Sequence, residues 1–300
     1  MSFENKLLEI LPVEQVRTNE PMSAHTTFRI GGPADYYLTP SIDRVSETIA
    51  MCRAENIPVT IIGNGSNLLV SDKGIRGAAI ALEKQMNQVT INGENIYAQA
   101  GAMLIAIAAK AAEQSLTGLE FASGIPGTIG GALAMNAGAY GGEMKDIIES
   151  VRILNMDGTE EVIDAETYAG EYRSSYIMKN NAVVLDAVLH LSQGDHNAIL
   201  QTMDELRTKR VEKQPLEYPS AGSTFKRPEG YFAGKLIMDA GLKGYTVGGA
   251  QVSEKHAGFV INIGGATASD VKQLMQDVSD KVMQQFGVAL EPEVRLIGEF

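Results

Sequence analysis

The stretch GLEFASGIPGTIGGALAMNAGAYGG, residues 118–142, constrains the fold of this chain more than any other feature. It is crowded with glycine and alanine, and it shows neither a clean helix period nor a clean strand period over its full length. Small residues at this density indicate that the backbone approaches something closely. We therefore expect the stretch to lie against another element or against a ligand.

Helices and strands are mixed around this stretch without strict βαβ alternation. Helices are predicted over 41–56, 102–115, 197–213, 234–240 and 269–286, with Ser41 and Ser269 as N-caps of the first and last, and Gly241 and Gly287 ending the last two. Strands are predicted over 59–62, 75–82, 151–154, 160–163, 182–191 and 256–263, and Asn92-Gly93 predicts a hairpin turn. This pattern favours α+β domains over one doubly wound sheet.

Composition is typical of a globular protein from a reducing compartment. Hydrophobic residues make up 44% of the chain, and the net charge of -12 argues against a general nucleic-acid partner. Cys52 is the only cysteine, and its helical spacing from Val45 and Ile49 predicts a core residue. Neither a signal peptide nor a membrane-spanning segment is predicted, so we expect a cytoplasmic protein with no membrane partner.

Two shorter glycine-rich loops add to the long stretch. GNGSN at 63–67 follows a predicted strand, and such a loop either cradles a pyrophosphate or forms a tight turn. It lacks the third glycine of the dinucleotide fingerprint, so a standard Rossmann site is not expected. IGGP at 30–33 has the same two interpretations. Together, the three segments favour one large cofactor lying along the backbone.

Three polar motifs each have a functional and a structural interpretation. AGSTFK at 221–226 places hydroxyls beside a lysine, but no serine–histidine pair is evident, so an ordinary polar loop is the alternative to a site. EPEVR at 291–295 would place Glu293 and Arg295 on one side of a strand, as site residues or as a surface ion pair. YRSSY at 172–176 is a polar aromatic cluster or a capped loop. No two of the four histidines have metal-ligand spacing, so no metal site is predicted.

A set of motifs follows a fixed order along the chain: HTTFRIGGPADYY, IIGNGSNLLVSDKGIRGAAI, GIPGTIGGALAMNAGAYGGE, YRSSYI, AGSTFKRPEG, AGKLIMDAGLKG and EPEVRLIG. This ordered set, from about Asn19 onward, resembles the UDP-N-acetylenolpyruvoylglucosamine reductase family. The resemblance implies an α+β chain: a two-subdomain FAD-binding fold of the vanillyl-alcohol-oxidase (PCMH) type and a C-terminal α+β substrate domain. The expected ranges are 1–85 for the first subdomain, to which the strand in 291–300 returns, 86–200 for the second, and 201–290 for the substrate domain.

The resemblance also implies the chemistry. NADPH would reduce noncovalently bound FAD, and the flavin would pass a hydride to the enolpyruvyl group of a UDP-sugar, leaving an enediolate. Ser223 would protonate the α-carbon, while Arg173 and Glu293 would stabilise the enediolate. Contacts with the diphosphate or the carboxylate are expected from Lys213, Lys226 and Arg295. The expected cofactor-binding residues are Gly31, Gly32, Gly63, Asn64, Gly65, Ser66, Asn67, Gly124, Ile125, Pro126, Gly127, Thr128, Gly130, Gly131, Ala132, Asn136 and Gly138.

The chain resembles the shorter form of that family. The longer form inserts a tyrosine-bearing segment that closes over the uridine diphosphate, whereas here few residues separate Tyr176 from the predicted strand at 182–191. Arg227 stands where the longer form has asparagine. Two alternatives stay open: another noncovalent-FAD oxidoreductase of the same fold that acts on a sugar or an alcohol, and a noncatalytic flavin- or nucleotide-binding regulator.

Overall fold

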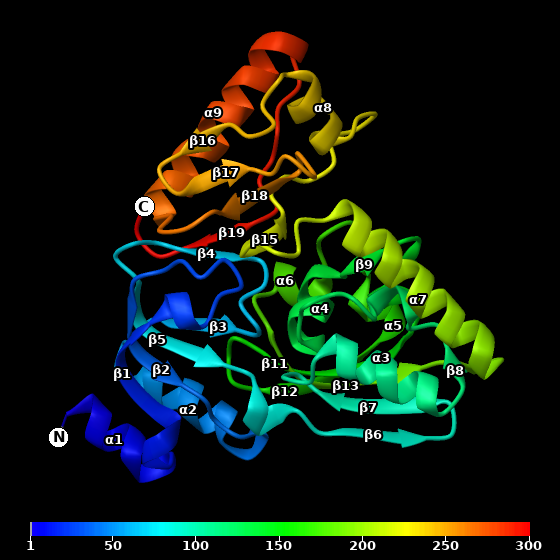
Figure 1. Cartoon of the computed structure of the whole chain (residues 1–300). Coiled ribbons are helices and arrows are strands. Elements are labelled where there is room, and N and C mark those ends of the chain that lie inside the picture. Colours follow the sequence, from blue (N-terminus) through cyan, green and yellow to red (C-terminus); the bar gives the residue numbers. More distant parts are fainter. Residues whose placement is uncertain (1) are drawn as a thin grey trace. The chain divides into compact units, whose positions relative to one another are not determined.

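The computed structural model describes residues 2–300 (Figure 1). The chain consists of two compact units. The first unit comprises Met1–Arg17, Tyr36–Asn64 and Ala78–Arg210, and the second comprises Thr18–Asp35, Gly65–Gly77 and Val211–Phe300. Two early segments therefore group with the C-terminal part of the chain. This division differs from the three ranges that the family resemblance implies, and those ranges stay a prediction.

The first unit contains a five-stranded antiparallel sheet in the order β12-β11-β13-β7-β6. Its strands are β6 (Val89–Asn92), β7 (Asn95–Gln99), β11 (Ile148–Leu154), β12 (Glu160–Asp164) and β13 (Val183–His190). The first two form the predicted hairpin, in which Gly93 adopts a φ of 60°. The predicted strands at 151–154, 160–163 and 182–191 are thereby confirmed, and the structure shows that they are neighbours in one sheet.

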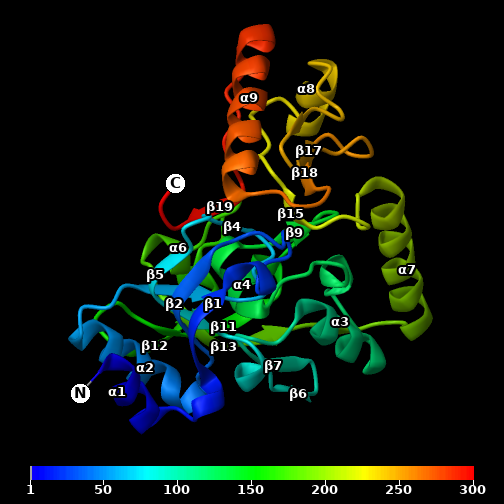
Figure 2. The ribbon, with the colours of Figure 1, turned by 60° about the vertical axis from the view of Figure 1, so that its left-hand side comes forward.

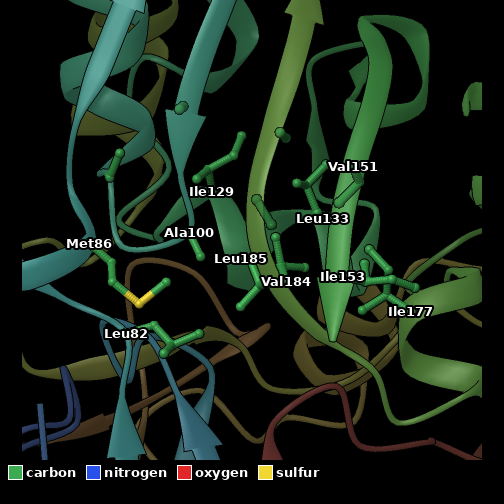
Figure 3. Packing of buried hydrophobic residues seen from close by; sticks show 14 of the residues in the cluster. Leu82, Met86, Ala100, Ile129, Leu133, Val151, Ile153, Ile177, Val184 and Leu185 are labelled. Carbon is green, nitrogen blue, oxygen red and sulfur yellow. The ribbon is translucent and has the colours of Figure 1, made fainter. Parts of the chain in front are cut away.

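The short helix α4 (Ile129–Met135) packs on this sheet and was not found from the sequence. Its two glycines lower the helix propensity, and its alanines produce only a weak hydrophobic periodicity. Ile129 and Leu133 lie one turn apart and are fully buried with Val151 and Leu185 (Figure 3). Burying one aliphatic side chain contributes about 1.5–3 kcal/mol, so packing rather than propensity stabilises this helix.

Helix α2 (Ile42–Ala54) lies where it was predicted. Ser41 occupies its N-cap position, but the serine side chain makes no capping hydrogen bond. Cys52 is fully buried, and its burial raises the pKa of the thiol to about 11. The prediction that Cys52 is a core residue is confirmed, and a thiol with this pKa is unreactive near neutral pH.

Further elements complete the region before residue 214. A four-stranded sheet has the order β1 (Val16–Pro21), β2 (Pro33–Leu38), β5 (Ile75–Ala81), β3 (Val59–Ile62). The remaining helices are α1 (Phe3–Ile10), α3 (Leu104–Glu113), α5 (Ala165–Tyr168), α6 (Tyr176–Lys179) and α7 (His196–Lys213). Two short strand pairs are also present, β8 (Leu116–Thr117) with β14 (Ser192–Gln193) and β9 (Gly138–Ala139) with β10 (Gly142–Glu143).

Across residues 2–300, no helix combines the length and the apolar character needed to cross a membrane.

The second unit contains an antiparallel sheet in the order β15 (Ser220–Ser223), β18 (Phe259–Asn262), β17 (Ala250–Val252), β16 (Thr246–Val247). Helix α9 (Ala268–Phe286) lies along this sheet and beside α8 (Ala233–Asp239) (Figure 2). Its buried face carries Val271, Leu274, Val278 and Val282. The strand β19 (Arg295–Ile297) pairs in parallel with β4 (Leu68–Val70), so the end of the chain returns to an early segment.

The N-cap of α9 is Thr267, and the prediction of Ser269 is wrong. Thr267 and Asp270 form a reciprocal capping box, which places Ser269 inside the first turn. The backbone N–H and the hydroxyl of Ser269 instead donate to Asp72, at 3.0 and 2.7 Å. At the other end, Gly287 takes the left-handed conformation with a φ of 67°, as predicted.

Candidate active site

In the first unit, two of the predicted cofactor-binding loops meet. The Asn64 side chain donates to the carbonyl of Pro126 at 2.7 Å. A Cβ atom placed on Gly63 would lie 2.4 Å from Thr128 Oγ1, so no residue with a side chain fits at that position without a shift. Loop 63–64 is therefore tied to the loop that leads into α4.

The start of α4 is fixed by local hydrogen bonds. Thr128 is buried and accepts from the Gly131 N–H at 3.4 Å through its hydroxyl. The Gly130 N–H donates to the carbonyl of Ala100 at 2.9 Å, which joins the glycine stretch to the strand-end segment after β7. The carbonyl of Gly124 accepts from the guanidinium of Arg210. The small residues of this stretch are used for close backbone packing, as the sequence indicated.

The other glycine-rich segments belong to the second unit. Gly65 has a φ of 61°, and a Cβ atom there would lie 2.1 Å from the carbonyl oxygen of His25, so both conformation and space require glycine. The Gly32 N–H donates to the carbonyl of Ser71 at 2.9 Å, and the Gly31 carbonyl accepts from Ser23 at 3.2 Å. Backbone hydrogen bonds therefore hold loop 30–33 against the segments that contain Ser23 and Ser71.

The same unit places Asn67 beside the C-terminal motif. The Asn67 side chain donates to the carbonyl of Glu293 at 3.1 Å, and its own carbonyl accepts from the Arg295 N–H at 2.9 Å. Two motifs more than 220 residues apart are therefore joined. Val294 is buried between the partly buried Glu293 and the exposed Arg295, as strand alternation requires.

Ser223 and Glu293 lie on neighbouring segments. Ser223 ends β15 opposite Phe259, and its side chain is exposed. The carbonyl of the next residue, Thr224, accepts from the Glu293 N–H at 2.9 Å. The Thr224 hydroxyl is buried and accepts from the Val260 N–H at 2.9 Å. Of these two adjacent hydroxyls, one is therefore held in the sheet and the other faces outward.

Cationic side chains lie near this pair of segments. Lys226 pairs with the Glu291 carboxylate, and its backbone N–H donates to the Glu291 carbonyl at 2.8 Å. Lys213 is exposed at the end of α7.

His256 is a partly buried imidazole of the same unit. Burial, together with the charges of Lys243 and Lys213, holds the pKa of His256 below its ordinary value. His256 Nδ1 accepts from the Gly258 N–H at 3.1 Å, so its other ring nitrogen carries the proton in the neutral state.

Arg173 belongs to the first unit, on the turn before α6. Its φ of 56° is left-handed, which is uncommon for a residue with a side chain. Its guanidinium lies 5.0 Å from the centre of the Tyr172 ring. Arg173 was predicted as a site residue from the YRSSY motif, but the contacts that hold its turn were not predicted. No role was predicted for His256. Within residues 2–300, no group of three or more His, Cys, Asp or Glu side chains could hold a metal ion.

Comparison with known proteins identifies the family. Residues 33–164 match the model of an FAD binding domain, and residues 214–297 match the C-terminal domain of UDP-N-acetylenolpyruvoylglucosamine reductase. The reductases of that name from Agathobacter rectalis and Lachnoclostridium phytofermentans are 55% and 54% identical; the matches cover 100% and 98% of this chain and 99% and 96% of those proteins. The chain belongs to the UDP-N-acetylenolpyruvoylglucosamine reductase family.

A solved structure of a UDP-N-acetylenolpyruvylglucosamine reductase, from Thermus caldophilus, is similar as well. Its TM-score is 0.82 at 35% identity, with 94% of this chain and 100% of that chain covered. The expected α+β fold, an FAD-binding domain followed by the C-terminal domain of this reductase family, is confirmed.

The residues of the first unit fit the cofactor that the family uses. The FAD-binding match includes both loop 63–64 and the stretch 124–138. These loops bring glycine backbone together, and any Cβ at Gly63 would fill the space that separates them. Loops of this composition offer N–H groups to a pyrophosphate. Asn136, also predicted to bind the cofactor, differs from these glycines because its buried side chain is already hydrogen-bonded within the protein. It donates to the Glu143 carboxylate and the Glu171 carbonyl and accepts from the Lys145 N–H.

Proposed function

We propose that this chain catalyses NADPH-dependent reduction of enolpyruvyl UDP-N-acetylglucosamine to UDP-N-acetylmuramate, a step in the synthesis of peptidoglycan precursors. The observation that carries the proposal is the full-length match to reductases of this name, with Ser223 and Glu293 held on neighbouring segments. FAD, when bound, accepts a hydride from NADPH and supplies it to the substrate. Because nucleotide sugars and NADPH are intracellular metabolites, we place the reaction in the cytoplasm.

Ser223 is the proposed proton donor to the α-carbon. Its hydroxyl is exposed at the end of β15, while the neighbouring Thr224 hydroxyl is occupied by the Val260 N–H. A serine is a weak acid, but an enediolate is a strong base, so a positioned hydroxyl suffices for the transfer. Strand alternation and the bond to Val260 therefore favour Ser223 over Thr224.

Arg173 and Glu293 are proposed to stabilise the charge that develops on the substrate carboxylate. The guanidinium of Arg173 supplies positive charge and a planar pair of donors for a carboxylate. Glu293 contributes only when it carries or shares a proton, since a bare carboxylate would repel the enediolate. Lys213, Lys226 and Arg295 are proposed contacts for the diphosphate or the carboxylate, because all three are cationic residues of the unit that holds Ser223.

Two measurements test this function. The purified protein should be yellow, with one FAD per chain that stays in the supernatant after acid precipitation. Beyond the one equivalent of NADPH per FAD that reduces the flavin, it should oxidise NADPH anaerobically only when the enolpyruvyl sugar nucleotide is present. A covalently retained flavin, or oxidation that depends on a simple alcohol or sugar instead, would favour another oxidoreductase of this fold. FAD binding without any substrate-dependent turnover would favour a binding protein.

A further inference from the structure

Asn136 joins three parts of the first unit through one buried side chain. It ends α4 in the left-handed conformation, with a φ of 45°, and is 1% exposed. Its amide nitrogen donates to a Glu143 carboxylate oxygen at 2.8 Å and to the Glu171 carbonyl at 3.1 Å. Its amide oxygen accepts from the Lys145 N–H at 2.9 Å. Both donors and the acceptor of the amide are thus engaged with the protein.

The Glu171 carbonyl belongs to the turn that carries Arg173. Glu171 and Ser174 exchange backbone hydrogen bonds at 2.9 and 3.2 Å, with Arg173 between them in its left-handed conformation. Such a conformation is strained for a residue with a side chain and persists only when surrounding contacts hold it. Ser175, fully buried, donates to the Ala134 carbonyl at 2.8 Å. The turn is therefore attached to the end of α4 on both sides of Arg173.

Glu143 lies on the other side of the Asn136 amide. Its carboxylate also pairs with Lys145 at 3.0 Å. The hydrogen bond from Lys145, with smaller contributions from the Asn136 amide and from the charge of Arg173, holds the pKa of Glu143 below its ordinary value. Glu143 is therefore an ionised acceptor at neutral pH, and it orients the amide that bonds to the Arg173 turn.

We propose that Glu143 is a positioning residue for Arg173 and acts through the Asn136 amide. The proposal rests on the proposed function, because the position of Arg173 matters to the rate only if its guanidinium stabilises the developing charge. A donor that is held in place before the reaction needs no reorganisation during it. Glu143 is not proposed to touch the substrate.

The test compares Glu143→Ala with Glu143→Gln in anaerobic stopped-flow, following flavin reduction by NADPH and flavin reoxidation by the sugar nucleotide separately. Alanine removes the acceptor, and we expect reoxidation about 10- to 100-fold slower, since small misplacement of a catalytic group has effects of this size. Reduction should stay within about twofold of wild type. Glutamine keeps an acceptor oxygen and should restore most of the reoxidation rate.

Asn136→Gly supplies a second, independent variant. Glycine adopts the left-handed conformation readily, so the end of α4 is kept while the amide is removed. Because Glu143 acts through this amide, the double variant should reoxidise no more slowly than Asn136→Gly alone. Multiplicative effects in the double variant would overturn the proposal.

Three further outcomes would also overturn it: reoxidation of Glu143→Ala within about twofold of wild type, equal slowing of both half-reactions, or a glutamine variant as slow as alanine. A wild-type enzyme that does not turn over the enolpyruvyl sugar nucleotide would instead refute the proposed function itself.

Discussion

Replacing Ser223 with alanine is the most direct test of the proposed chemistry. Ser223 is exposed at the end of β15, so losing its hydroxyl should change the free energy of unfolding by no more than about 0.5 kcal/mol. The backbone of β15 is held by pairing with β18 and by the Thr224–Val260 bond, neither of which involves the Ser223 side chain. FAD content and melting temperature should therefore match those of wild type.

The expected kinetic effect is much larger than this stability effect. A positioned acid is worth about 100- to 10,000-fold in rate. At 1.36 kcal/mol for each factor of ten, that is about 2.7–5.4 kcal/mol in the barrier to substrate reduction. Flavin reduction by NADPH transfers no proton to the α-carbon, and Ser223 has no part in it. The two half-reactions should therefore separate by at least about 100-fold in the alanine variant.

Anaerobic stopped-flow at the flavin absorbance band measures both steps. The variant should bleach with NADPH at a near-normal rate and then reoxidise slowly when the sugar nucleotide is added. Ser220→Ala is the matched control, because Ser220 lies on the same strand and is part-buried, and both of its steps should stay near wild type. Equal slowing of both steps by Ser223→Ala would make Ser223 structural. Normal reoxidation would mean that water or another hydroxyl delivers the proton.

Two other substitutions probe charge and stability. Arg173→Lys keeps the positive charge but loses the planar guanidinium that can pair with a carboxylate through two donors. Flavin reoxidation by the sugar nucleotide should therefore slow at least about tenfold. A rate within about twofold of wild type would assign the stabilisation of the enediolate to another residue. The two carboxylate oxygens of Asp72 accept from the N–H groups of Ala268 and Ser269, in the first turn of α9, at 2.7 and 3.0 Å. Asp72→Asn removes one of these acceptor oxygens and the negative charge at the start of the helix. We expect the second unit to lose about 1–2 kcal/mol of stability in denaturant unfolding. Lys73→Ala, an exposed neighbour paired with Glu299 at 3.6 Å, should change stability by less than about 0.5 kcal/mol. Equal effects of Asp72→Asn and Lys73→Ala would show that the hydrogen bonds of Asp72 to the first turn of α9 do not stabilise the unit.

The sequence alone determined the features that depend on short-range physics. The helix over 42–54, the hairpin at Asn92-Gly93 and the glycine that ends α9 follow from apolar spacing and from backbone conformations that few residues adopt. Cys52 was predicted as a core residue from its helical spacing alone. The ordered motifs also predicted the family, because their order along the chain is a property of the sequence.

Only the tertiary structure decided which distant segments act together. Helix α4 forms in a glycine-rich stretch because the sheet buries Ile129 and Leu133, which propensity does not register. Ser269 lies in the first turn of α9 because Thr267 and Asp270 form the cap, and its N–H then donates to Asp72, nearly 200 residues away. Thr224 and Ser223 have similar hydroxyls, yet pairing with β18 engages the first and leaves the second exposed. For α4 a buried contact with the sheet decides the outcome, and for the two hydroxyls the pairing with β18 does, because both depend on residues far away along the chain.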